Sequence, residues 1–266
     1  MRSTLSIFIA LFILSSCNSL EFSPDQTFNK NSPRDLNAQN VARIQSTAAK
    51  DDTLRFIVTG DTQRSHDEVK TMISKINSLE AIEFVAIAGD LSEFGVLKEM
   101  EWIADSFKKL TVPYVAIVGN HDLVAKGNEV FERMYGPLNY SFTYRGIKFV
   151  CHDTNSREYH FDGSTPNISW LRQELQQQAN VTGFVTISHV PPNSLDFEQK
   201  LIVPYSSLFG TTQGFLASFH GHTHTYSQFG YEGSRVPYII TASNANKEFL
   251  LVKIINNKLS YERIFF

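Results

Sequence analysis

The sequence predicts an α/β fold in which two β-sheets pack face to face and helices cover their outer faces. Three apolar segments in the first half, 54–59, 84–88 and 114–118, have the β-branched composition of buried strands. Helical periodicity follows the first two, which is typical of parallel strands joined by crossover helices. Strand-like segments outnumber helical ones in the second half, and a second sheet packed on the first accommodates them.

The composition fits one globular domain of ordinary charge. The chain has 266 residues, of which 42% are hydrophobic, enough for one sizeable α/β core. Its 21 phenylalanines are scattered among apolar residues and not among basic ones, a pattern that indicates core packing. A formal charge of −3 and a pI near 6.2 provide no basic surface, so we predict no nucleic-acid binding.

The first 17 residues have the features of a bacterial lipoprotein signal peptide. Arg2 precedes an apolar run over 5–14, which is too short to span a bilayer as a mature helix. The run ends in Leu14-Ser15-Ser16-Cys17, which resembles the lipobox at which such peptides are cleaved. We therefore predict lipidation of Cys17 and a lipid anchor to a bacterial membrane of the cell envelope, on the periplasmic or surface side. The alternative is an ordinary secretory signal with an incidental cysteine.

A polar tether is predicted between this signal and the folded domain. Residues 18–52 are rich in Asn, Gln and Ser, contain Pro24 and Pro33, and show little periodicity. The domain itself is expected to span 53–266. Its single cysteine, Cys151, lies in a strand-like run and is expected to be a small core residue.

The first half repeats one pattern at the ends of its three strands. Each strand stops at a glycine followed by an acidic or amide residue, in Gly60-Asp61, Gly89-Asp90 and Gly119-Asn120. Helical spacing over 69–79 and 96–110 supplies the crossovers that make the strands parallel. Because parallel strands have their carboxyl ends at one edge, where α/β proteins place their sites, we expect these side chains to meet there.

The second half combines strands with histidines at their ends. Its predicted elements are a hairpin over 140–153, a helix around Trp170, strands over 184–188, 214–219 and 236–241, and a hairpin over 249–266. The first of these single strands delivers His189, and the second leads to Gly221-His222-Thr223-His224. The segment 197–209 is ambiguous and is expected as a loop over the site. A histidine-rich turn alone is as typical of plain surface as of a metal site, so its meaning depends on the upstream carboxylates.

Five short blocks occur in the order found in the calcineurin-like metallophosphoesterases, and the chain resembles that family. They are Gly60-Asp61-Thr62-Gln63, Gly89-Asp90-Leu91-Ser92-Glu93, Gly119-Asn120-His121-Asp122, His189-Val190-Pro191 and Gly221-His222-Thr223-His224. The resemblance implies a four-layer αββα sandwich with two packed mixed sheets and a dimetal site at the loop edge. It also implies a phosphatase or phosphodiesterase that hydrolyses a phosphate ester with a metal-bound hydroxide.

The resemblance assigns the metal ligands as well. It implies that Asp90 bridges two divalent or transition-metal ions, since a carboxylate offsets the repulsion between them. The other expected ligands are Asp61, Gln63 and His224 at the first ion, and Asn120, His189 and His222 at the second. Mixed nitrogen and oxygen donors without thiolates suit Mn, Fe, Zn or Co and argue against a structural zinc site.

His121 and Asp122 are predicted as catalytic residues on the same grounds. In the family the histidine after the amide ligand does not bind metal, so His121 is expected to contact the phosphate or protonate the leaving oxygen. Asp122 is expected to hold the orientation of His121, and Asn120 to contact the substrate in addition to the metal. The alternative for His121 is a hydrogen-bonded residue beside the centre.

Gln63 departs from the family pattern, which mostly has a histidine at this position. A Gln carbonyl can ligate but is a poorer donor than imidazole, so the first site is expected to be weaker or to favour harder ions such as Mn or Mg. Gln63 also motivates an alternative function, a lipid-anchored binding or scaffold protein on a catalytically impaired phosphoesterase fold. A hydrolase for a non-phosphate ester is a further alternative.

The remaining polar candidates lie outside this set. His160 and His220 are expected as scaffold or surface residues, His152 is not expected as a ligand, and His66 is expected as a solvated loop residue or, alternatively, a residue that lines the rim. Asn155 and Arg157 follow a strand end and are expected to face the substrate. The sequence leaves the identity of the phosphoester open, because selectivity depends on loops that carry no recognisable motif.

Overall fold

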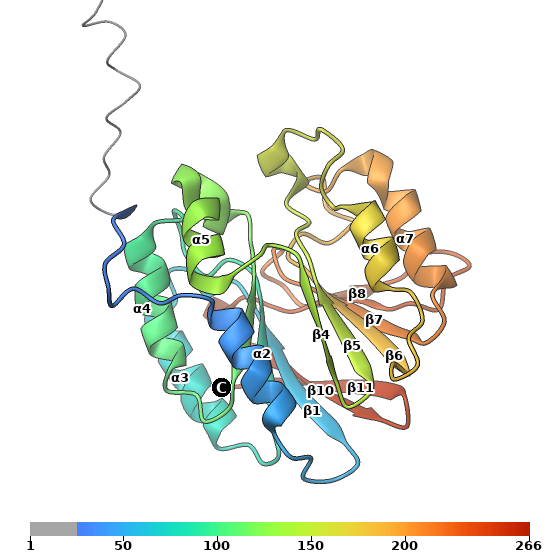
Figure 1. The fold of residues 1–266 in the computed structure, drawn as a ribbon, viewed down its shortest axis with the longest axis horizontal. Coiled ribbons are helices and arrows are strands. Elements are labelled where there is room, and N and C mark those ends of the chain that lie inside the picture. Colours follow the sequence, from blue (N-terminus) through green and yellow to red (C-terminus); the bar gives the residue numbers. More distant parts are fainter. Residues whose placement is uncertain (1–25) are drawn as a thin grey trace, which may run out of the picture.

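Two mixed β-sheets form the centre of the computed structural model, which describes residues 26–266 (Figure 1). The first sheet has the order β11-β10-β1-β2-β3, with β1 Leu54–Thr59, β2 Phe84–Ala88, β3 Tyr114–Ile117, β10 Glu248–Ile255 and β11 Lys258–Phe265. The second has the order β4-β5-β6-β7-β9-β8, with β4 Tyr140–Tyr144, β5 Ile147–Cys151, β6 Gly183–Ile187, β7 Phe215–His220, β8 Ser227–Phe229 and β9 Tyr238–Ile240. The predicted signal peptide 1–17, with Cys17, lies outside the described residues.

The strands that carry the expected site are parallel. In the first sheet β1, β2 and β3 run in one direction, and in the second β5, β6, β7 and β9 do. The hairpin of β10 and β11 joins β1 in antiparallel pairing, with Leu54 opposite Ile254. The carboxyl ends of the parallel strands therefore collect the loops that follow them at one edge of each sheet.

Helices cover the outer face of each sheet and complete the αββα sandwich (Figure 1). The helices on the first sheet are α3 His66–Asn77, α4 Leu97–Phe107 and α5 Gly127–Tyr135, and those on the second are α6 Ile168–Glu174 and α7 Ile202–Thr211. Short 3₁₀ turns follow several strands, namely η2 His121–Lys126, η3 Ser156–Tyr159, η4 Gln199–Leu201 and η5 Asn244–Asn246. The predicted fold class is confirmed.

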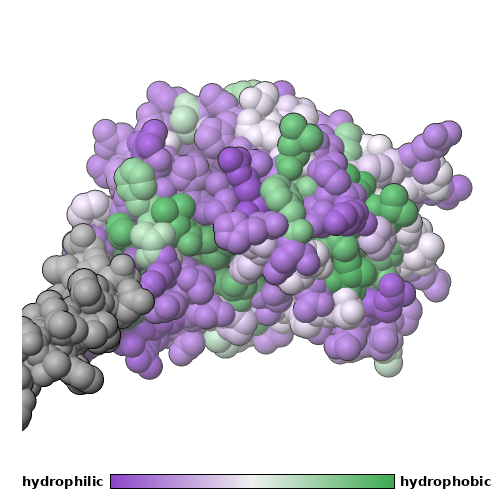
Figure 2. Space-filling view, turned by 90° about the horizontal axis from the view of Figure 1, so that it is seen from above, coloured by the Kyte–Doolittle hydropathy of each residue, from purple (hydrophilic) through white to green (hydrophobic). Residues whose placement is uncertain are grey.

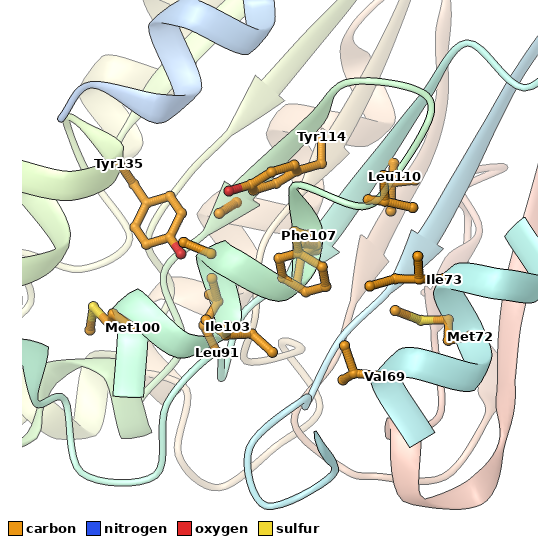
Figure 3. Close-up of a cluster of buried hydrophobic side chains, with 14 of the residues drawn as sticks. Val69, Met72, Ile73, Leu91, Met100, Ile103, Phe107, Leu110, Tyr114 and Tyr135 are labelled. Carbon is orange, nitrogen blue, oxygen red and sulfur yellow. The ribbon is translucent and has the colours of Figure 1, made fainter. Parts of the chain in front are cut away.

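The predicted helical periodicity buries one stripe of each crossover helix. Val69, Met72 and Ile73 of α3 point toward Ile103 and Phe107 of α4 in the outer core of the first sheet (Figure 3). All of these side chains are at most 4% exposed. Full burial of an aliphatic or aromatic side chain stabilises a fold by roughly 1.5–3 kcal/mol, so this stripe fixes both helices on the sheet.

Phenylalanines fill the core between the two sheets. Phe56 stacks on Phe84 with ring centroids 5.1 Å apart, and Phe149 meets both rings edge to face. Phe142 on β4 and Phe219 on β7 join the same cluster. These phenylalanines are therefore core residues, as predicted, whereas Phe94, Phe161 and Phe265 are exposed.

The prediction of a plain polar tether over 18–52 is wrong for its second half. Residues 36–46 form the helix α2 Leu36–Ser46, which packs at the open edge between β3 and β4. The Asn37 side chain exchanges two hydrogen bonds with the backbone of Ala116, at 2.8 and 2.9 Å, and Ile44 is fully buried between the sheets. Because one anchor of this helix is a buried amide, hydrophobic periodicity could not reveal it.

The segment 197–209 is also more regular than predicted. It forms η4 and most of α7, and Tyr205 and Phe209 are fully buried against the second sheet. The expected loop over the site is confined to the residues before it. Among residues 26–266, no helix has both the length and the apolar character that crossing a membrane requires.

Candidate metal centre

The loops after β1, β2, β3, β6 and β7 bring the predicted ligands together. Asp61 and Asp90 are each 1% exposed, His189 is fully buried, and one ligand atom from each lies within 4.8 Å of the others. The view onto the upper edge of Figure 1 shows a largely hydrophilic face with several hydrophobic patches (Figure 2). Asp61, Asp90 and His189 thus form a buried group of two carboxylates and an imidazole beneath this edge, and these donor types bind divalent transition metals.

The hydrogen bonds of His189 leave the lone pair of one ring nitrogen directed at two oxygen atoms. Its Nδ1 lies 2.7 Å from the carbonyl oxygen of Ala88, which can only accept, so Nδ1 carries the proton. In the neutral ring, Nε2 then directs its lone pair at Asn120 Oδ1, 3.0 Å away, and Asp90 Oδ1, 3.3 Å away. His189 Nε2, Asn120 Oδ1 and Asp90 Oδ1 are three acceptor atoms that converge in this way and attract a cation. These three residues therefore fit a metal ion.

Electrostatics support the same conclusion. Burial by itself would lower the pKa of His189, but the neighbouring carboxylates of Asp90 and Asp61 outweigh it and raise the pKa to about 10. Burial likewise opposes ionisation of Asp90, yet the charges of His189 and His121 hold its pKa below the ordinary value. The cluster thus requires positive charge, which either a second proton on His189 or a bound cation supplies.

His222 is oriented by a carboxylate that no sequence motif indicates. Its Nε2 lies 3.1 Å from Asp196 Oδ2, and its Nδ1 lies 3.1 Å from Asn120 Oδ1. The carboxylate fixes the ring proton on Nε2 and leaves Nδ1 as the donor atom toward the centre, an arrangement common around metal-binding histidines. Asp196 lies in the loop between β6 and η4, where no motif identifies it.

The first predicted site has looser contacts. His224 Nε2 is 3.4 Å from Asp61 Oδ1, and the side chain is 54% exposed. Gln63 Nε2 donates to Asp90 Oδ2 at 3.1 Å, while its buried Oε1 has no hydrogen-bond partner within residues 26–266. A buried carbonyl oxygen without a partner costs free energy, and a cation beside Asp90 would compensate it once the amide turned.

The backbone explains why glycine precedes Asp90 and Asn120. Asp61 and Asp90 have φ values of 52° and 55°, in the left-handed region that costs energy for residues other than glycine. A Cβ at Gly89 would lie 2.4 Å from His189 Nδ1, and one at Gly119 would lie 2.1 Å from the backbone nitrogen of Asp90. Only glycine lets the loops approach one another this closely.

His121 lies beside the cluster with one ring nitrogen open. Its backbone N–H donates to Asp90 Oδ1 at 3.0 Å, and its Nδ1 donates to the carbonyl oxygen of Glu93 at 2.9 Å. The ring is 36% exposed, so Nε2 is accessible to a ligand at the centre. This geometry suits a group that contacts a phosphate or moves a proton.

Asp122 binds the loops around His121 and not the His121 ring itself. Its carboxylate is fully buried and accepts hydrogen bonds from Leu91 N, Ser92 N, Ser92 Oγ and Gly119 N, at 2.8 to 3.2 Å. Within the described residues its hydrogen bonds go to these groups and not to the His121 ring, so any effect on the orientation of His121 acts through the loops. Burial and the charge of Asp90 raise the pKa of Asp122 to about 6. Asp122 ties the loops after β2 and β3 together and positions both Asp90 and His121.

The other predicted positions divide between scaffold and rim. Asn155 is fully buried and donates to Val118 O and Asp153 Oδ1, so the expectation that it faces substrate is wrong. Arg157 is 66% exposed and bonds Asp196 at 3.1 Å, which places it at the rim. His152 and His220 are buried scaffold residues bonded to Tyr205 and to Ser188 and Ser218, and His66 packs edge to face with Trp102.

Comparison with known proteins identifies the class of protein that this fold and site define. The chain belongs to the calcineurin-like phosphoesterase family, whose sequence profile matches residues 54–226. It is similar, at 31% identity over 84 residues, to a probable cyclic nucleotide phosphodiesterase of Xenorhabdus bovienii. That match covers 32% of this chain and 33% of the relative, so the chain matches about a third of the relative's length.

Solved structures share the fold at low sequence identity. A dimetal phosphatase from Danio rerio superimposes with a TM-score of 0.66 at 12% identity, over 80% of this chain and 96% of that one. A purple acid phosphatase from yellow lupin gives 0.61 at 12% identity, over 82% and 52%. GAP50, the anchor in the inner membrane complex of Plasmodium, gives 0.60 at 13% identity, over 81% and 85%. At these identities the similarity establishes the metallophosphoesterase fold alone.

Proposed function

We propose that the protein is a metal-dependent phosphoesterase that hydrolyses a phosphate monoester or diester at the centre described above. The observation that carries the proposal is the convergence of His189 Nε2 and His222 Nδ1 on Asn120 Oδ1, beside the carboxylate of Asp90. Such a group of donors is costly unless it binds a cation. The family membership of residues 54–226 supports phosphate-ester chemistry at that cation.

The ligands divide between two positions around Asp90. Asp61, Gln63 and His224 would hold one ion, and Asn120, His189 and His222 the other. When bound, divalent ions supply Lewis acidity, which offsets the charge on phosphate oxygens and makes water a better nucleophile near neutral pH. Mn, Fe, Zn or Co suit this mixture of nitrogen and oxygen donors.

His121 would act on the substrate directly. The Glu93 carbonyl accepts from Nδ1 at 2.9 Å, which leaves Nε2 of this 36% exposed ring as the nitrogen for the substrate. Protonated His121 can donate from Nε2 to the oxygen that leaves phosphorus, and the neutral ring can take the proton back from solvent. Asp122 supports this role through the loops and not through the ring.

A phosphodiester is a narrower candidate substrate class than phosphate esters in general. The relative from Xenorhabdus bovienii is named as a probable cyclic nucleotide phosphodiesterase, which supports tests with diesters as well as monoesters. The alternative, a scaffold protein on the same fold, predicts metal binding without turnover.

The experiment is a metal and substrate panel on purified residues 18–266. We expect Mn, Fe, Zn, Co or Ni to stimulate hydrolysis of bis(p-nitrophenyl) phosphate or p-nitrophenyl phosphate, and Asp90→Asn to abolish it with loss of bound metal. His121→Ala should keep its metal and lose about 10²–10⁴-fold in kcat, the usual contribution of a general acid. His160→Ala, at an exposed histidine of the 156–162 loop, is the matched control. Bound metal without turnover on any substrate would favour the scaffold alternative.

We further propose that Cys17 carries a lipid that anchors the domain to a bacterial membrane. The lipobox-like Leu14-Ser15-Ser16-Cys17 supports this proposal. Mass spectrometry of the amino-terminal peptide should find an acylated Cys17, and Cys17→Ser should move the protein from the membrane pellet to the soluble fraction. An unmodified cysteine, or unchanged partitioning of the variant, would contradict the proposal.

A further inference from the structure

We propose that a pocket beside the metal centre binds an uncharged aromatic group of the substrate, such as a nucleobase or an aryl ring. The inference rests on the proposed phosphoesterase function and narrows its substrate class. The pocket has a volume of about 150 Å³, and we call it the aromatic pocket. The lining residues that matter here are Gln63, Arg64, His66, Glu93, Phe94 and Trp102.

The aromatic pocket shares its wall with the metal centre. Gln63 lines the pocket and donates to Asp90 at 3.1 Å, while Glu93 lines it and accepts through its backbone carbonyl from His121 at 2.9 Å. One layer of side chains therefore separates the pocket from the groups expected to contact phosphate. An organic substituent on a phosphate at the centre would lie within reach of it.

Two large aromatic side chains are exposed at this pocket. Phe94 is 54% exposed and Trp102 is 50% exposed, although most aromatic side chains of the described chain are buried. His66 meets Trp102 edge to face at 6.3 Å, and the Lys98 ammonium lies 5.9 Å from the Trp102 ring centroid. Neighbours thus restrain the indole while leaving half of it open to stack against another flat ring.

The loop that carries Phe94 is fixed before any ligand arrives. Glu99 Oε2 accepts from the backbone nitrogens of Glu93 and Phe94, at 3.1 and 2.9 Å. The Ser92 hydroxyl accepts from Gly95 N at 3.2 Å and donates to the buried Asp122. A platform held in place loses little entropy on binding, which favours recognition by stacking.

Charge at the pocket excludes a second phosphate as its occupant. Arg64 forms an ion pair with Glu93, so its positive charge is already matched. Lys98, which lies over the Trp102 ring, pairs with Glu101 at 3.6 Å, and Glu99 lines the pocket with a further carboxylate. An anionic group would meet Glu99 and cations that already have carboxylate partners, whereas an uncharged ring would meet two aromatic faces.

The test compares two phosphodiesters with the same leaving group. Bis(p-nitrophenyl) phosphate carries a second aryl ring, and methyl p-nitrophenyl phosphate carries a methyl group in its place. We expect Trp102→Ala and Phe94→Ala each to reduce the ratio of kcat/KM for the aryl over the methyl diester about tenfold, the usual effect of losing one stacking partner. Trp102→Phe should retain most of the ratio. Phe265→Ala removes another exposed ring, on the edge strand β11 that β10 separates from β1, and should leave the ratio unchanged.

A binding measurement tests the aromatic pocket without requiring catalytic turnover, and so separates this inference from the proposed function. The chain has two tryptophans, so a Trp170→Phe variant reports on Trp102 alone. p-Nitrophenylphosphonate should quench this fluorescence saturably, methylphosphonate should not, and Phe94→Ala should weaken the effect. Turnover with an unchanged aryl preference in both alanine variants would overturn the inference. If no metal gives turnover, the proposed function fails. If p-nitrophenylphosphonate also does not quench the fluorescence, the proposal that the aromatic pocket binds an aromatic group is contradicted as well.

Discussion

Asp196→Asn tests how far the loop after β6 controls the metal centre. The substitution keeps the shape of the side chain but removes the charge that faces His222 Nε2 across 3.1 Å. An asparagine can also present its NH₂ group, which would favour the tautomer with the proton on Nδ1. That tautomer removes the nitrogen lone pair from the side of the ring that faces Asn120.

The size of the effect follows from the contact. A hydrogen bond to a charged group contributes about 1.5–3 kcal/mol, and loss of such a partner behind a metal-binding histidine costs about 10–100-fold in metal affinity. Asp196 is 28% exposed and also bonds Arg157, so solvent screens part of its charge. We therefore expect the low end, about a tenfold loss of affinity at the second site.

The assay is a competition titration of Mn or Zn against a fluorescent chelator, with kcat and KM measured at each metal concentration. Excess metal should restore most of the activity of Asp196→Asn. Asp51→Asn is the matched control, because Asp51 also bonds an arginine, Arg55 at 2.8 Å, and lies before β1 at the opposite end of that strand. Equal affinities in wild type and Asp196→Asn, within about twofold, would refute the proposed orientation of His222.

Three further predictions concern individual side chains. His224→Ala should empty the first site more completely than His222→Ala empties the second, because Gln63 leaves His224 as the only imidazole there; equal metal loss by elemental analysis would contradict this. Burial lowers the pKa of His152 from 6.5 to about 4, so the folded state binds fewer protons than the unfolded chain. Unfolding free energy should therefore fall by about 2 kcal/mol between pH 7 and pH 5, and His152→Gln should flatten the slope in urea titrations; parallel slopes would be evidence against it. Burial raises the pKa of Cys151 to about 12, so a thiol reagent should label it only in denaturant, and rapid native labelling would exclude a core position.

The sequence was sufficient for the fold class and for the group of Asp61, Asp90 and His189. Each of these residues lies two positions after the end of an apolar strand, so the hydrophobic pattern predicts its place along the chain. Parallel topology then brings the strand ends to one edge without any knowledge of side-chain packing. Ligands at strand ends are therefore predictable from one sequence.

Contacts that depend on loop geometry were not predictable in this way. Asp196 reaches His222 across 26 positions of the chain, through a loop with no periodicity. Asp122 follows His121 directly, yet its carboxylate turns inward to four hydrogen bonds from the loop backbones and Ser92. Helix α2 was missed for the related reason that a buried amide, Asn37, does part of the anchoring. Polar groups that satisfy backbone atoms leave no hydrophobic signature.

The candidate metal centre carries two free-energy costs, backbone strain and buried polar charge. A fold retains such costs only when another interaction offsets them. Asp61, Asp90, His222 and His224 all adopt left-handed backbone, with φ between 52° and 74°, and each such residue costs of order 1–3 kcal/mol. The same loops bury carboxylates and imidazole lone pairs against one another. Glycines at the strand ends make the approach sterically possible, but they do not reduce the electrostatic cost. A cation bound only by the folded state would offset both costs at once, since it stabilises the native state by mass action. The backbone strain and the buried charge would thus both be offset by the metal binding proposed for this centre.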